Sequence, residues 1–170
     1  MTEQDMLALK GIDAIEIYNG SCDDDSDTAD STYMWDLMLA QGHPYTGCAT
    51  DDAHFNPDGR AAALGWVMIK SESLDPDALL IALKAGDYYS SSGPEIFNVQ
   101  VEPQEKLTVY CSPASRVFAL GIPAESQVVF GNGLSKAEFS LAKWKSPYVR
   151  IVVRDDAGRK AWLNPIWLSV

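Results

Sequence analysis

The sequence lacks long apolar runs and is poor in positive charge. No stretch approaches the roughly 18 consecutive apolar residues of a membrane-spanning segment, so we expect no transmembrane helix. The chain has 13 Lys and Arg against 24 Asp and Glu, a formal net charge of −11. This balance argues against a nonspecific nucleic-acid binder, which needs a basic surface to displace counterions from phosphates. It also argues against docking to anionic membranes.

Cysteine is scarce as well. The three cysteines, Cys22, Cys48 and Cys111, are an odd number without a CxxC spacing, and reduced thiols in a cytoplasm are the simplest interpretation. The first residues, MTEQDMLALKG, lack the basic start and the apolar run of a secretory signal. We therefore expect a cytoplasmic protein, unless a leader upstream of Met1 is missing.

The chain does have enough apolar material for a core, since 46% of its residues are hydrophobic, and this argues against disorder. Its charge is divided unevenly. Residues 1–90 hold 4 basic and 17 acidic side chains, whereas residues 91–170 hold 9 and 7. This division suggests two domains with different roles. We place the boundary at Ser92-Gly93-Pro94, which gives domains 1–93 and 94–170.

The first domain alternates strand and helix signals. The expected strands cover residues 12–18, 45–50 and 65–70, and the expected helices cover residues 32–41 and 76–85. Asp75 and Pro76 begin the second helix and Gly86 ends it. The Asp-rich segment 21–31 is expected to be a polar loop. Strands separated by helices of this length predict βα units with parallel pairing.

The second domain has a different rhythm, with short apolar runs at close spacing. The seven expected strands cover residues 96–101, 107–110, 116–120, 127–130, 137–141, 148–154 and 161–168. Turn residues separate them, as in Gly131-Asn132-Gly133. This pattern predicts a small antiparallel β-sandwich.

The strongest chemical signal is Asp51-Asp52-Ala53-His54, at the end of the expected strand 45–50. In parallel α/β proteins the functional groups project from the carboxyl ends of strands. On an extended backbone residues i and i+2 point the same way, so Asp52 and His54 are placed to hold one metal ion. A carboxylate with an imidazole suits Zn, Mn or Fe. The alternative is a polar loop in which Asp51 caps a turn.

Other candidate residues have simpler interpretations. We interpret His43 as a turn or surface residue and Cys48 as a small buried residue. The Asp-rich segment has Asp at alternate positions from 23 to 27, as calcium loops do. However, Thr28 and Met34 stand where the EF-hand needs Gly and Glu, which favours a solvated acidic loop.

Four segments occur in an order that resembles a known family. They are GIDAIEIYNG (11–20), WDLMLAQG (35–42), TGCATDDAH (46–54) and GWVMIKSESLDPDALLIALKAGDYYSSSGPEI (65–96). Together they resemble the latter part of the PHP (polymerase and histidinol phosphatase) metal-dependent phosphoesterases. The closing AWLNPIW (161–167) resembles the tail of some two-domain PHP-like proteins. The resemblance implies an α/β fold, a partial PHP-type (β/α) barrel in residues 1–93, followed by the small antiparallel β-sandwich.

The resemblance also implies hydrolysis of phosphoesters by a metal-activated water, with Zn, Mn or Fe as the metal. The last metal motif of the family, DxH, corresponds to Asp52 and His54. Glu16 matches a glutamate common at this strand in the family. Asp51, Ser91 and Ser92 are expected near the site, where the serine hydroxyls are able to contact a phosphate.

The other metal ligands of the family have no counterpart here. There is no HxH, and His43 is the second of only two histidines. A site with two or three ligands is expected to bind metal weakly. We therefore expect the C-terminal portion of a phosphoesterase, weak or inactive as an isolated chain, with an upstream portion missing. The alternative is a noncatalytic homo-oligomer that keeps part of the fold and pairs through exposed strand edges.

Overall fold

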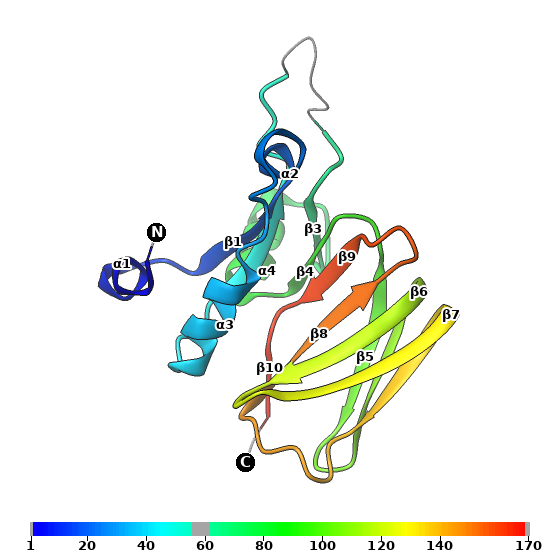
Figure 1. Ribbon diagram of the computed structural model, residues 1–170. Helices are drawn as coiled ribbons and strands as arrows, with labels where there is room; N and C mark the ends of the chain where they lie inside the picture. The colour runs from blue at the N-terminus through cyan, green and yellow to red at the C-terminus, as the bar shows by residue number, and fades with distance from the viewer. Residues whose placement is uncertain (1, 56–61, 169–170) are drawn as a thin grey trace. The chain divides into compact units, whose positions relative to one another are not determined.

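The computed structural model describes residues 2–55 and 62–168, in which β-structure predominates (Figure 1). Strands account for 45% and helices for 20%. The chain forms two compact units, Met1–Ser92 (unit 1) and Gly93–Val170 (unit 2). Unit 1 mixes helices with strands, whereas the described part of unit 2 is built from strands.

Unit 1 begins with a short capped helix. Its elements are α1 (Glu3–Ala8), β1 (Ala14–Asn19), α2 (Gly20–Ser26), α3 (Thr32–Ala40), β2 (Thr46–Thr50), β3 (Trp66–Ile69), α4 (Pro76–Ala85) and β4 (Tyr88–Ser91). In α1 the Thr2 hydroxyl accepts a hydrogen bond from the Asp5 N–H, and the Asp5 carboxylate accepts one from the Thr2 N–H. This reciprocal cap stabilises a helix in which Met6 is the buried residue.

Strands β1 and β2 form a parallel pair in which Ile15 lies opposite Gly47. Ile17 and Trp35 are fully buried beside this pair. A Cβ on Gly47 would lie 2.9 Å from Ile17 and 3.0 Å from Trp35, so a larger residue here would displace these buried side chains. The Trp35 indole donates a hydrogen bond of 2.8 Å to the Tyr45 carbonyl, which fastens α3 to the start of β2. The expected parallel pairing is confirmed for these two strands.

Helix α4 has the limits that the sequence predicts. Asp75 caps its N-terminus, Pro76 is the first helical residue, and Gly86 ends it with a φ of 80°. Although α4 connects β3 to β4, these strands pair antiparallel, with Trp66 opposite Ser91. In the described part of unit 1, the parallel arrangement therefore does not continue beyond β1 and β2.

The segment 21–31, expected to be a polar loop, contains most of helix α2. The Asn19 side-chain oxygen caps this helix by accepting from the Cys22 N–H at 2.9 Å. Asp23 lies in the first turn, where the helix dipole favours a negative charge. Asp27 ends the helix with a φ of 54°. Caps at both ends, rather than an apolar face, account for this short polar helix.

Unit 2 is an antiparallel sheet organised around one long strand. Its elements are β5 (Ile96–Glu102), β6 (Lys106–Gly121), β7 (Glu125–Ser140), β8 (Tyr148–Arg154), β9 (Lys160–Leu163) and β10 (Ile166–Trp167). Along one edge β6 pairs with β7, and along the other it pairs with β5 in its first half and with β8 in its second half. Both β9 and β10 pair with β8.

The sheet curls because β6 and β7 bend at the same place. Register shifts interrupt their ladder on either side of Ala114, which lies opposite Leu134. The start of β7 thereby approaches its end, where the Gln127 amide donates to the Ser140 carbonyl at 2.7 Å and accepts from the Ser140 N–H at 3.1 Å. The buried side chains of this unit include Leu107, Val109, Val117, Phe139, Ile151 and Val153.

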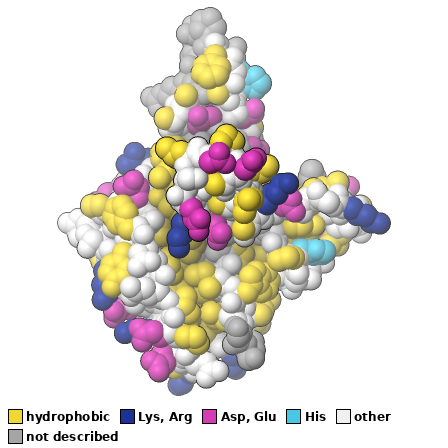
Figure 2. Space-filling model, turned by 180° about the vertical axis from the view of Figure 1, so that it is seen from behind, with side chains coloured by type: hydrophobic (Ala, Val, Ile, Leu, Met, Phe, Trp, Pro, Cys, Tyr) yellow, Lys and Arg dark blue, Asp and Glu magenta, His cyan; other side chains and the backbone are white. Residues whose placement is uncertain are grey.

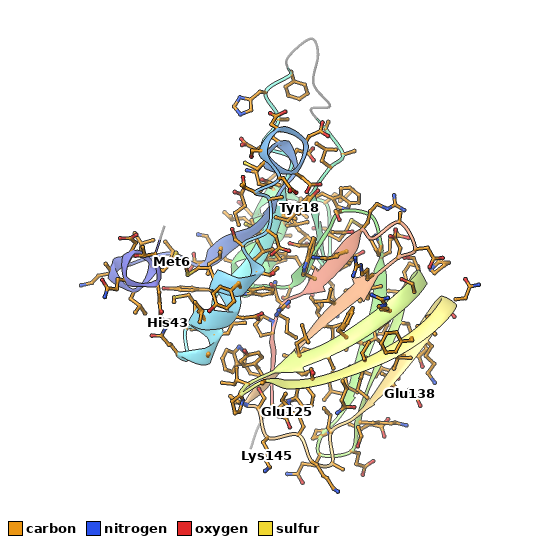
Figure 3. The ribbon with its side chains drawn as sticks, in the orientation of Figure 1. Met6, Tyr18, His43, Glu125, Glu138 and Lys145 are labelled. Carbon is orange, nitrogen blue, oxygen red and sulfur yellow. The ribbon has the colours of Figure 1, made fainter. Side chains whose placement is uncertain are left out.

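The loop after β7 is fixed by a carboxylate. Glu125 accepts hydrogen bonds from the N–H groups of Lys145 and Ser146, at 2.7 to 3.1 Å, and Figure 3 shows Glu125 close to Lys145 at one end of the sheet. The curl is therefore held by side chains that bond to backbone groups across its open side.

The fold class expected from the sequence is wrong. The chain is mostly β-structure with a curled antiparallel half-barrel, and it contains no partial PHP-type (β/α) barrel in the residues described. The expected sandwich is one curled sheet, because the strands expected over 107–110 and 116–120 are both part of β6. Likewise Gly131-Asn132-Gly133 lies inside β7, at its bend, instead of forming a turn between two strands.

Replacing Gln127 with Ala should loosen the open side of the curled sheet. The change removes both hydrogen bonds to Ser140, and each such bond contributes about 0.5–1.5 kcal/mol. We expect the Ser140 amide to exchange its hydrogen about tenfold faster, as measured by NMR. Ser126→Ala, at the exposed neighbouring position, is the matched control and should leave this rate unchanged. Equal exchange rates in the two variants would contradict the role given to Gln127.

Candidate functional site

Polar side chains of unit 1 gather where β1 and β2 end. Because the two strands are parallel, their carboxyl ends meet at one edge, and Asn19 lies opposite Thr50 in the register. Strand β1 contributes Glu16 and Asn19, while Asp51 and Asp52 follow β2 directly. The fold thus brings together residues more than 30 positions apart in the chain.

Asn19 connects the two carboxylates of this cluster. Its side-chain nitrogen donates to Oε2 of Glu16 and to Oδ2 of Asp52, each at 3.2 Å. An amide nitrogen carries two hydrogens, so a single residue satisfies both acceptors. The Thr50 hydroxyl donates to Oε1 of Glu16. Both oxygens of Glu16 are therefore engaged within the protein, whereas Oδ1 of Asp52 is close to His54.

Asp52 and His54 form the pair that the sequence predicts. Oδ1 of Asp52 lies 3.4 Å from Nε2 of His54, and the two side chains are 47% and 68% exposed. Two ligands of one tetrahedral ion, with bonds of about 2.0–2.1 Å, are separated by about 3.3 Å. Asp52 has a φ of 50°, so a left-handed turn brings the side chains together, in place of the extended backbone expected.

Helix α2 holds this turn in place. The Ser21 N–H donates to the Asp51 carbonyl at 3.0 Å, and the Ser21 hydroxyl donates to the Asp52 carbonyl at 2.9 Å. Gly20 is packed so closely that a Cβ there would lie 2.4 Å from Cβ of Leu64. These contacts fix the backbone that carries the Asp52 carboxylate.

Asp51 anchors the chain that returns to β3. Its carboxylate accepts hydrogen bonds from the N–H groups of Ala63, Leu64 and Gly65, at 2.7 to 2.9 Å. Burial acts to raise the pKa of Asp51, but the three N–H donors outweigh burial and lower this pKa below its ordinary value. Asp51 thus caps a turn, as the alternative interpretation of the motif predicts.

Tyr18, labelled in Figure 3, directly precedes Asn19 in β1. Its hydroxyl donates a hydrogen bond of 2.9 Å to the Asp23 carboxylate. Burial first, and then this bond and the charge of nearby carboxylates, raise the pKa of Tyr18 to about 12. The phenol therefore stays protonated at neutral pH and serves as a hydrogen-bond donor.

The other sequence candidates lie elsewhere. His43 precedes β2 and Asp52 follows it, so a strand of about 17 Å separates them, and His43 stacks on Tyr45. Cys48 lies within β2, where burial and the charge of Glu16 raise the pKa of its thiol. We therefore assign neither His43 nor Cys48 to the cluster.

The serine segment belongs to a strand. Ser91 is buried in β4, and Ser92 directly follows that strand. The neighbouring Ser90 connects β4 to β2, because its hydroxyl donates to the Gly47 carbonyl at 2.8 Å and accepts from the Ala49 N–H at 2.9 Å. This segment therefore tethers two strands of unit 1.

Sequence reasoning missed Asn19 and Thr50, the residues that engage Glu16. In the sequence Asn19-Gly20 indicates a turn, although it also places an amide at the end of an expected strand. Their position was the one signal that could have identified Asn19 and Thr50 as site residues, since polar residues at the carboxyl ends of parallel strands meet at one edge of the sheet.

The cluster offers few metal ligands. Within residues 2–55 and 62–168, no group of three or more His, Cys, Asp or Glu side chains is arranged to hold a metal ion. In the same part of the chain no helix is long and apolar enough to cross a membrane. Comparisons with protein families, curated proteins and solved structures find no match to this chain.

Replacing Asp51 with Asn should destabilise unit 1, because a neutral amide replaces the anion that accepts three N–H groups. We expect a loss of about 1 kcal/mol, a low figure because solvent screens a partly exposed carboxylate. The folded pKa is lowered, so the stabilisation is present above the unfolded pKa of about 3.9 and is lost as the pH falls through the folded value.

Thermal unfolding from about pH 6 to about pH 3 tests this expectation. The melting temperatures of the wild type and Asp51→Asn should converge toward the acidic end. Asp24→Asn, an exposed substitution on α2, is the control and should follow the wild type. A gap between wild type and Asp51→Asn that stays constant with pH would mean that the charge of Asp51 is not responsible.

Proposed function

We propose that unit 1 contributes part of a divalent-metal site for phosphoester hydrolysis, with Asp52 and His54 as its two ligands. The observation that supports this proposal is the 3.4 Å separation of Asp52 Oδ1 and His54 Nε2 beside the ends of two parallel strands. The resemblance of segment 46–54 to the DxH motif of PHP phosphoesterases supports the same chemistry.

The donor atoms fit a divalent transition metal. A carboxylate oxygen and an imidazole nitrogen are ligands that Zn, Mn and Fe accept. Both side chains are exposed enough to admit an ion together with water molecules. Glu16, which shares the Asn19 amide with Asp52, is a further carboxylate of the cluster. However, it would have to give up a hydrogen bond to Asn19 or Thr50 in order to bind. We therefore expect two protein ligands from this cluster.

Two ligands limit both affinity and activity. Catalytic zinc sites commonly have about three protein ligands, so a two-ligand site should bind weakly and reversibly. When bound, the ion would lower the pKa of a water molecule and offset negative charge on the phosphoryl oxygens. We expect the isolated chain to hydrolyse phosphoesters slowly, unless another chain or segment contributes further ligands.

The residues around the pair orient it. Asn19 holds Oδ2 of Asp52, which leaves Oδ1 on the side of His54. Ser21 holds the Asp52 carbonyl. Supporting hydrogen bonds of this kind change metal affinity by about 10- to 100-fold. Asn19 is therefore a positioning residue of the proposed site.

The double variant Asp52→Asn/His54→Gln should lose metal binding. We expect calorimetric titration of the wild type with Zn²⁺ or Mn²⁺ to show about one site of micromolar or weaker affinity, and the double variant to show no binding above background. The matched control Asp24→Asn/His43→Gln makes the same chemical changes elsewhere in unit 1 and should bind as the wild type does. Equal binding by all three proteins would place the ion at other residues.

Hydrolysis is measured separately with para-nitrophenyl phosphate in the presence of Mn²⁺. Slow turnover that depends on the metal and disappears in Asp52→Asn/His54→Gln would support the phosphoesterase proposal. Metal binding without any turnover would overturn the hydrolytic role of the isolated chain while leaving the metal site standing.

Asn19→Ser separates two roles of this residue, the capping of α2 and the orientation of the Asp52 carboxylate. Serine is also a good N-cap, so α2 should keep its cap, as judged by an unchanged circular dichroism spectrum. The substitution removes the donor to Glu16 and Asp52, and we expect metal affinity to fall by about 10- to 100-fold. Unchanged affinity in a folded Asn19→Ser protein would show that Asp52 needs no orientation by Asn19.

A noncatalytic interaction protein is the second candidate function. It is favoured by Leu80 and Ile81, two large apolar residues exposed next to each other on α4. Contiguous exposed apolar surface is where proteins commonly bind partners, and these two residues provide the start of such a surface.

A further inference from the structure

Helix α4 carries an exposed stripe whose two ends have opposite charge. At about 100° per residue, Asp77, Leu80, Ile81 and Lys84 fall on one side of the helix, away from the buried Ala82. Leu80 is 48% and Ile81 is 70% exposed, and Asp77 and Lys84 are exposed as well. We call these four residues the α4 stripe. Figure 2 shows one face of the molecule, on which apolar side chains lie exposed among acidic and basic ones.

The α4 stripe is complementary to a second copy of itself that runs antiparallel. Asp77 and Lys84 are equally far along the helix from the midpoint between Leu80 and Ile81. In two antiparallel copies of α4 with this midpoint on the two-fold axis, Asp77 of each copy faces Lys84 of the other. Leu80 and Ile81 then meet at the centre, and the two helix dipoles oppose each other favourably.

We propose that α4 is a self-association surface through which two copies of the chain pair antiparallel. The charges favour a second copy of the chain as the binding partner. The stripe reads acid, apolar, apolar, base, and a two-fold rotation places the acid of one copy opposite the base of the other. Leu74, which is 92% exposed, is a further apolar residue at the surface and immediately precedes Asp75, the N-cap of the helix. The surface uses none of the residues of the proposed metal site, so either proposal can fail without the other.

The association should be weak. A single helix pair buries far less than the roughly 800 Å² per partner of a standard stable interface, so we expect a dissociation constant on the order of 100 µM. The expected behaviour is a reversible monomer–dimer equilibrium that shifts with protein concentration.

Charge reversal tests the antiparallel pairing. In sedimentation velocity of the full chain from about 10 to about 500 µM, we expect the wild type to dimerise. Asp77→Lys or Lys84→Asp alone places like charges opposite each other at both ends of the stripe. Each should weaken dimerisation about tenfold or more, since juxtaposed like charges are costly. The double variant Asp77→Lys/Lys84→Asp should restore it.

A mixture of the single variants gives a sharper result. The Asp77→Lys chain has lysine at both ends of the stripe, and the Lys84→Asp chain has aspartate at both ends. Each should be monomeric alone, whereas an equimolar mixture should form a heterodimer. Asp24→Lys, a charge reversal on α2, is the control and should dimerise as the wild type does.

If the variants acted only through the stability of α4, the double reversal would dimerise least, which is the opposite of the rescue expected from antiparallel pairing. Asp77 near the N-terminus and Lys84 near the C-terminus both suit the helix dipole, so the double reversal is the least favourable variant for α4 itself. Rescue by the double reversal therefore reports on contact between copies. Ile81→Glu, at a 70% exposed position, should abolish dimerisation without unfolding the chain. A wild type that stays monomeric, or a double reversal that behaves like the single ones, would overturn the proposal.

Discussion

The register of β1 on β2 is the constraint on which the candidate site depends. Ile15 and Ile17 are buried, so the alternation of the strand turns Glu16 to the opposite face. A slip of one residue would bury Glu16 and expose the isoleucines, which the core does not allow. Gly47 allows this close packing, because a Cβ there would push against the side chains of Ile17 and Trp35. The packing of apolar residues thereby determines which polar side chains meet at the end of the sheet.

The cluster has an electrostatic reason to attract a cation. The side-chain nitrogen of Asn19 donates to the carboxylates of both Glu16 and Asp52, at 3.2 Å each. The two carboxylates are therefore close enough for their negative charges to repel each other. The amide offsets part of that repulsion with its two hydrogens but carries no net charge. A divalent ion at Asp52 and His54 would supply positive charge beside this pair. The charge of unit 1 therefore favours the proposed ligand as well as the geometry does.

Local signals in the sequence predicted where helices begin and end, whereas contacts between distant residues determined how the strands pair. Asp75, Pro76 and Gly86 set the limits of α4 because each acts within one turn of the helix. The approach of Asp52 to His54 was predicted from an extended backbone, whereas a left-handed turn at Asp52, which the sequence does not signal, produces it. The antiparallel pairing of β3 and β4 was not predictable, since a connecting helix is compatible with either direction.

The curl of unit 2 follows from the bend that β6 and β7 share at Ala114, and Gln127 meets Ser140 across its open side; no local pattern encodes either contact. Two copies of unit 1 would carry like charge, since residues 1–90 hold 4 basic and 17 acidic side chains. Beyond about 8–10 Å this repulsion is screened at physiological salt, so the charges next to the contact decide whether two copies associate. The α4 stripe contains one acid and one base and is locally neutral. In this acidic unit, antiparallel pairing on the α4 stripe places each acid of the stripe opposite a base, so the contact between the two stripes joins no like charges.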